Sequence, residues 1–150
     1  MTFTMLESFN LAFAGLLAGA ELVVCLGVRV PLRNLEQQPQ ILMRQDLIQR
    51  LRLLVPALMA PTVISAAALA VMESERPGFV LRCVGLAAMA VWLATTFLGT
   101  VPINKAAMDW RPDAPPDNWR RTVRIWEWLD VVRCLAAVAA LGCFAAAGLT

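Results

Sequence analysis

Residues 9–30 read FNLAFAGLLAGAELVVCLGVRV, an apolar run that Glu21 interrupts near its middle. A bilayer core of about 30 Å is crossed by roughly 20 helical residues, so this run is long enough to span a membrane. Pro31 and Arg33 follow it, at the level expected for lipid headgroups. No Lys or Arg precedes the run, which therefore lacks the charged start of a cleaved signal peptide. We expect it to be retained as the first membrane helix.

Three more apolar stretches of similar length follow along the chain. They lie at about Leu51–Met72, Val80–Ile103 and Trp126–Leu149. Pro56 and Pro61 fall inside the first of these three. Because proline removes a backbone donor and kinks a helix, a bent helix is expected there, with neighbouring groups satisfying the freed carbonyls.

The composition agrees with one membrane domain. The chain has 150 residues, and a domain usually takes about 100–200 residues. Hydrophobic residues make up 59% of the chain and the mean hydropathy is +0.65, above the roughly 45–50% apolar content of a soluble domain. The predicted fold class is therefore all-α: a single integral membrane four-helix bundle over residues 1–150.

The distribution of basic residues predicts the orientation of this bundle. The joining loops are expected at Leu32–Arg50, Glu73–Phe79 and Asn104–Ile125, and Lys and Arg gather around the first and third of them. Since basic residues prefer cytoplasmic loops, both termini are predicted on the non-cytoplasmic side. The formal charge of only +2, with basic residues spread between apolar segments, argues against nucleic acid as a partner.

Two segments near the membrane boundary have recognisable patterns. Residues 42–50 mix apolar and polar side chains in a pattern that predicts an amphipathic extension of the second helix along the interface. Trp119, Trp126 and Trp128 follow a proline-rich stretch in the third loop. Tryptophans at this level are typical interfacial anchors.

The first candidate for chemistry is Glu21, in the middle of the first apolar run. A charged side chain within the bilayer costs roughly 2.5–3.5 kcal/mol on insertion scales, so it needs a partner or a function. Glu21 shares a helix face with Ala14, Ala18 and Cys25. This carboxyl is therefore expected to face the interior of the bundle.

A second charged group lies in the fourth stretch. Asp130 and Arg133 are three residues apart, close enough for a pair within one helix, and Trp126 extends their face. Glu127 is expected near the membrane surface, in contact with water. Together with Glu21, these residues form either a structural ion-pair network or a site that binds and activates a hydrophobic molecule. A third interpretation, ion or proton transport, would require an oligomer.

Cysteine and histidine usage narrows the chemistry further. The four cysteines form no CxxC pair and the chain contains no histidine, so a thiol-redox or His-metal enzyme is not expected. We expect Cys25, Cys83, Cys134 and Cys143 to fill contacts between helices as small apolar side chains.

Several motifs resemble those of a known family. Gly19-Ala20-Glu21, Val101-Pro102-Ile103-Asn104 and the series Trp119, Trp126, Arg133 are similar to motifs of the anthrone oxygenase-like family of small four-helix membrane proteins. The resemblance extends over essentially the whole chain and is weakest in the second helix. One position departs from the family pattern, because Asp130 stands where the family usually has histidine.

The resemblance implies a function, a set of site residues and a location. Named family members oxidise an anthrone to an anthraquinone with dioxygen and use no metal or flavin cofactor. The implied catalytic residues are Glu21, Asp130 and Arg133, and the implied substrate-binding residues are Asn104, Trp119 and Trp126. The expected partners are membrane lipid and a hydrophobic small molecule, a homo-oligomer remains open, and a bacterial inner membrane is the expected location. The alternative is a non-catalytic bundle that binds a lipophilic ligand or acts as an accessory or structural subunit.

Overall fold

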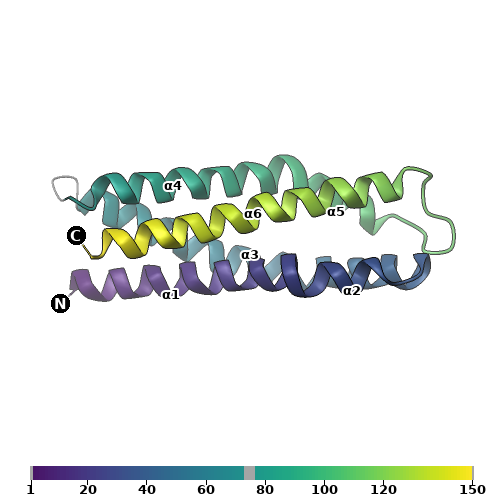
Figure 1. Cartoon of the computed structure of the whole chain (residues 1–150), viewed down its shortest axis with the longest axis horizontal. Helices are drawn as coiled ribbons and strands as arrows, with labels where there is room; N and C mark the ends of the chain where they lie inside the picture. Colours follow the sequence, from purple (N-terminus) through teal and green to yellow (C-terminus); the bar gives the residue numbers. More distant parts are fainter. Residues whose placement is uncertain (1, 73–76, 150) are drawn as a thin grey trace.

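The computed structural model describes residues 2–72 and 77–149, and every regular element in these ranges is helical. Within them, four helical stretches are long and apolar enough to cross a membrane: Phe3–Arg33, Gln37–Met72, Phe79–Met108 and Trp119–Ala147. They lie side by side in one elongated bundle, with the two chain ends at the same end of it (Figure 1). The predicted all-α membrane bundle is thus confirmed, whereas the side of the membrane that the termini face stays a prediction.

Each of these stretches is built from one or more helical elements. The first consists of α1 (Thr2–Leu22), the π-helical segment η1 (Val23–Val28) and α2 (Arg29–Arg33). The second is the single helix α3 (Gln37–Met72). The third consists of α4 (Phe79–Ala94), the π-helical segment η2 (Thr95–Thr100) and α5 (Val101–Met108), and the fourth is α6 (Trp119–Ala147).

Both π-helical segments occur next to a proline. A proline ring clashes with the carbonyl four residues earlier, and for Pro31 and Pro102 those carbonyls belong to Gly27 in η1 and Leu98 in η2. A wider helical turn is one way to relieve this clash without breaking the helix. Single π-helical turns of this kind often occur at functional sites. Here both line the same cavity, and each lies in the second half of its stretch.

Two of the predicted loops are shorter in the structure. Helix α3 already begins at Gln37, so residues 42–50 are helical as expected and belong to the same continuous helix as the spanning segment. The reason is that Ile41 and Ile48 on this segment pack against buried residues of α5 and α6. The third loop shrinks to residues 109–118, between α5 and α6. In the second predicted loop, residues 73–76 lie outside the described residues.

The core forms where α1, α3, α4 and α6 meet. Helix α6 packs against both α4 and α1, and α1 packs against α3. Many core residues are alanines, and small side chains let membrane helices approach closely. Gly85 on α4 serves the same purpose, because a Cβ atom there would lie 2.4 Å from the ring of Phe144 on α6. Helix α3 continues through Pro56 and Pro61, and the bend expected there stays a prediction.

The cysteines agree only in part with their expected packing role. Cys25 and Cys134 are buried, and Cys143 is half-buried. Cys83 is exposed on α4, so it fills no contact inside this bundle. The expectation therefore holds for the two cysteines in the middle of the bundle and is wrong for Cys83.

Candidate functional site

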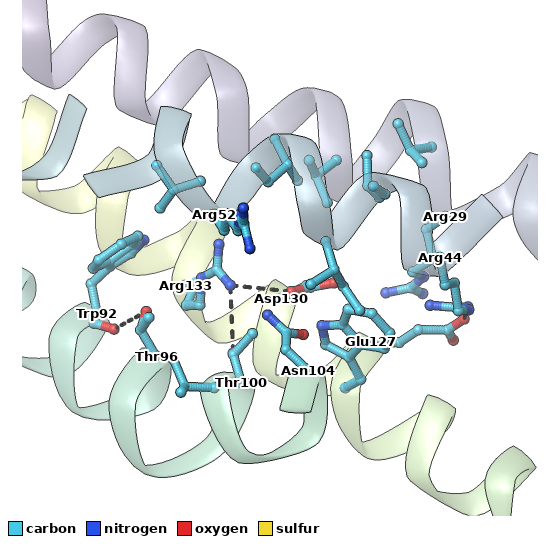
Figure 2. A pocket seen from close by; sticks show the side chains of 18 of the residues that line it. Arg29, Arg44, Arg52, Trp92, Thr96, Thr100, Asn104, Glu127, Asp130 and Arg133 are labelled. Atoms are coloured by element: carbon cyan, nitrogen blue, oxygen red, sulfur yellow. Dashed lines mark hydrogen bonds and ion pairs between the residues drawn. The ribbon is translucent and has the colours of Figure 1, made fainter. Parts of the chain in front are cut away.

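A cavity of about 210 Å³ lies inside the bundle at the level of the two π-helical segments. All four membrane stretches contribute to its wall, through η1 and α2, α3, η2 and α5, and α6 (Figure 2). A cavity of roughly 150 Å³ is enough to bind benzene, whereas drug-sized ligands occupy about 300–1,000 Å³. The space therefore suits a compact ring system. Arg52, Pro56 and Phe97 on the wall are also exposed, so the cavity reaches the outer surface between α3 and η2.

A buried ion pair joins the first and fourth stretches beside this cavity. Glu21 Oε1 lies 2.5 Å from Nη2 of Arg133, and the two side chains are only 2% and 8% exposed. The indole N–H of Trp92 donates a second hydrogen bond, of 3.1 Å, to the same carboxylate oxygen. The guanidinium carbon of Arg133 lies 5.2 Å from the Trp92 ring centre, which adds a cation–π contact. The predicted inward orientation of Glu21 is confirmed.

Asp130 stands on the other side of the same guanidinium. Its Oδ1 lies 3.6 Å from Nη1 of Arg133, as the three-residue spacing predicted. Nη1 also donates a long hydrogen bond, of 3.4 Å, to the hydroxyl of Thr100. Asp130 lines the cavity, and its side chain is 14% exposed. Arg133 is therefore held between the closely bound carboxylate of Glu21 and the looser one of Asp130. Figure 2 shows the contact with Asp130.

A second buried ion pair lies further along the cavity wall. Nη2 of Arg44 is 3.0 Å from Oε1 of Glu127, and the Arg44 guanidinium lies 5.2 Å from the Trp126 ring centre. The expectation that Glu127 contacts water is therefore wrong. The sequence pattern places Arg44 in a loop, whereas α3 carries Arg44 into the bundle opposite Glu127. The burial of Gln40 and Ile48, four residues to either side of Arg44, marks this inner face.

The predicted substrate-binding residues separate into two groups. Asn104 and Trp126 line the cavity. The side-chain oxygen of Asn104 is buried and has no hydrogen-bond partner within the part of the chain that the structure describes. Trp119 packs with Ile41 and Val123 instead, in a cluster nearer the third loop. The expectation that Trp119 and Trp126 face the membrane boundary is wrong, whereas Trp128 is exposed and fits the role of an anchor.

The sequence contained a signal for Trp92, Thr96 and Thr100, three wall residues that were not predicted, in addition to the predicted Asn104. Trp92, Thr96, Thr100 and Asn104 follow one another at intervals of four residues, and all four line the cavity. Such spacing places side chains on one helix face. Polar residues at this spacing within an apolar membrane stretch therefore indicate which helix face lines a site. The π-helical turn of η2 rotates the residues that follow it, so the spacing alone does not give their exact direction.

The fold and the site define a class: a small integral membrane bundle whose four helices enclose a cavity with buried charges on its wall. Within this class, the chain belongs to the anthrone oxygenase family, because the family model described as "Anthrone oxygenase" matches residues 45–143, more than half of the chain. No curated protein and no solved structure matches the chain. The matched segment includes Asn104, Trp126, Asp130 and Arg133 and leaves Glu21 outside it.

Proposed function

We propose that this protein is a membrane-embedded, cofactor-independent oxygenase that oxidises a hydrophobic, anthrone-like aromatic substrate with dioxygen. The observation that carries the proposal is the pairing of Asp130 with Arg133 on the wall of a ring-sized cavity. A carboxylate and a fixed cation side by side are what proton removal and anion stabilisation require. Membership of the anthrone oxygenase family supports the same reaction class.

The first step of the proposed reaction is removal of a proton from the methylene carbon opposite the anthrone carbonyl. Asp130 is the proposed base, because its carboxylate faces the cavity and its contact with Arg133 is loose. Proton loss places negative charge on the carbonyl oxygen, and the guanidinium of Arg133 stabilises this enolate. The unpartnered side-chain oxygen of Asn104 accepts a hydrogen bond from a ring hydroxyl and orients the substrate.

The later steps use the substrate's own electrons. The electron-rich anion passes one electron to dioxygen, and the resulting radical and superoxide combine, with one proton, to a hydroperoxide on the former methylene carbon. Loss of the second hydrogen from that carbon breaks the O–O bond and releases water. One oxygen atom of dioxygen becomes the new carbonyl and the other becomes water, so the carbon loses four electrons and dioxygen gains them.

Glu21 has a different role in this proposal. Its Oε1 binds both Arg133 and Trp92, which line the cavity, but Glu21 is not itself part of the wall that the described residues form. We therefore propose Glu21 as a positioning residue that fixes the Arg133 guanidinium. Replacing it is expected to weaken stabilisation of the enolate without removing the base.

The test is dioxygen uptake by the detergent-purified protein with a hydroxylated model anthrone. Wild type is compared with Asp130→Asn, Glu21→Gln and the control Asp46→Asn, whose carboxylate lies on the exposed side of α3. We expect uptake above the spontaneous rate in wild type and control. A general base typically contributes about 10²–10⁴-fold, so Asp130→Asn should lose turnover by that factor, and Glu21→Gln by less. The circular dichroism spectrum of each variant is compared with that of wild type as the control for folding.

Two outcomes would contradict the proposal. Uptake by wild type that does not exceed the spontaneous rate would rule out the oxygenase. Dioxygen uptake that stays at the wild-type level in both Asp130→Asn and Glu21→Gln would refute the roles of Asp130 as the base and of Glu21 as a positioning residue.

A non-catalytic bundle that binds a lipophilic ligand is the second candidate. One observation favours a non-catalytic role for the charges: Arg82 and Glu7 form a largely buried ion pair, with 2.7 Å between Nη2 and Oε1, and neither residue lines the cavity. Quenching of tryptophan fluorescence by the model anthrone, without accelerated dioxygen uptake, would support this candidate over the oxygenase.

A further inference from the structure

The cavity wall carries more positive than negative charge. Among the described residues, the wall contains Arg29, Arg44, Arg52 and Arg133 but only two carboxylates, Glu127 and Asp130. Adding Glu21, which binds Arg133, still leaves three carboxylates against four guanidinium groups. Positive charges that border one cavity repel one another, and an anion in the cavity lowers this repulsion. The excess therefore points to an anion that the chain itself does not supply.

The excess comes from two of the four arginines. Arg44 is paired with Glu127, and Arg133 with Glu21 and Asp130. The side chains of Arg29 and Arg52 make no hydrogen bond or ion pair with any residue in the ranges 2–72 and 77–149. Both line the cavity, so their guanidinium groups border the same space as the proposed catalytic pair.

Arg52 is the better placed of the two for binding a ligand. It follows Arg44 and Ile48 at four-residue intervals, and all three line the cavity, so Arg52 stands on the inner face of α3. In Figure 2 Arg52 and Arg133 are both drawn on the wall of the cavity, so both guanidinium groups border the space that a ligand would occupy.

We propose that the natural substrate carries a carboxylate on its ring system and that Arg52 binds this carboxylate. This inference rests on the proposed oxygenase function and makes Arg52 a specificity-determining residue. Guanidinium is the side chain best suited to this task, since its planar donors match the two oxygens of a carboxylate. The substrate would then extend between two cations, with its carboxylate at Arg52 and the developing enolate at Arg133.

An anionic lipid is a second possible source of the negatively charged oxygens that Arg52 would bind. Arg52 is exposed as well as lining the cavity, so the phosphate of an anionic lipid headgroup has chemical access to it. The experiment therefore varies the lipid as well as the substrate. The full-length protein is placed in nanodiscs of phosphatidylcholine, or of phosphatidylcholine with phosphatidylglycerol.

Dioxygen uptake is measured with a neutral hydroxyanthrone and with its carboxyl-substituted counterpart. Hydrogen bonds to charged groups make one such contact worth about tenfold or more in affinity. Wild type should therefore show a KM about tenfold lower for the acid in both kinds of disc. Arg52→Gln should lose this preference and show equal KM values for the two compounds. Arg121→Gln is the matched control, because Arg121 is an exposed arginine of α6 that does not line the cavity, and it should keep the preference.

Three results would overturn the inference. Equal KM values for the two compounds in wild type, with both turned over, would refute carboxylate recognition and leave the oxygenase proposal intact. A preference that disappears in wild type once phosphatidylglycerol is present would assign Arg52 to a lipid headgroup. If neither compound is turned over, the oxygenase proposal fails. Quenching of tryptophan fluorescence by the two compounds then tests carboxylate binding by Arg52 without any turnover. Equal affinities of wild type for the two compounds would refute that binding.

Discussion

Replacing Glu21 by Gln should destabilise the bundle strongly, because it removes the charge that balances a buried arginine. Glu21 and Arg133 are 2.5 Å apart and almost fully buried. Removing one partner of a buried ion pair typically costs about 3–5 kcal/mol. Asp130 remains 3.6 Å from Arg133 and compensates part of the loss, so we expect a value near the lower end, about 3 kcal/mol.

The assay is unfolding of the protein in mixed micelles with increasing SDS, followed by circular dichroism. The control is Asp46→Asn, which breaks an ion pair of similar length, 2.7 Å to Arg50, whose side chains are 51% and 74% exposed. Exposed pairs contribute little, so the midpoint of the control should stay at the wild-type value. Equal midpoints for Glu21→Gln and Asp46→Asn would refute the reasoning that burial makes the Glu21 pair essential.

Two further predictions concern packing and hydrogen bonding in the core. Gly85→Ala should destabilise the bundle by about 1–3 kcal/mol, since the new methyl group would overlap the buried ring of Phe144. Gly15→Ala is the control: its methyl group would meet no atom within 4 Å, so it should be neutral or slightly stabilising in the same SDS assay. Asn10→Ala should cost on the order of 1 kcal/mol, because the Asn10 amide donates to the Thr62 carbonyl at 3.0 Å inside the bundle. An unchanged SDS midpoint for Asn10→Ala would show that this bond adds nothing measurable.

Much of the candidate site could be predicted because its charged residues stand out within apolar stretches of the sequence. Glu21, Asp130 and Arg133 are charged residues within apolar stretches, and each was found from that contrast alone. Their meeting in one cluster could only be guessed from helix faces. Arg44 and Glu127 were missed, since their charge looked ordinary near a predicted loop and only the length of α3 shows that they are buried.

The four helices long and apolar enough to cross a membrane follow from the sequence alone, because span length and hydropathy depend only on residues that are neighbours in the chain. Which charges pair depends on the folded bundle. Glu21 and Arg133 are 112 positions apart, and Arg44 and Glu127 are 83 positions apart. A pairing over such separations depends on how the helices pack and on where the π-helical turns rotate their faces. The same packing leaves a cavity in the middle of the bundle and places the Arg52 guanidinium beside it without a carboxylate of its own.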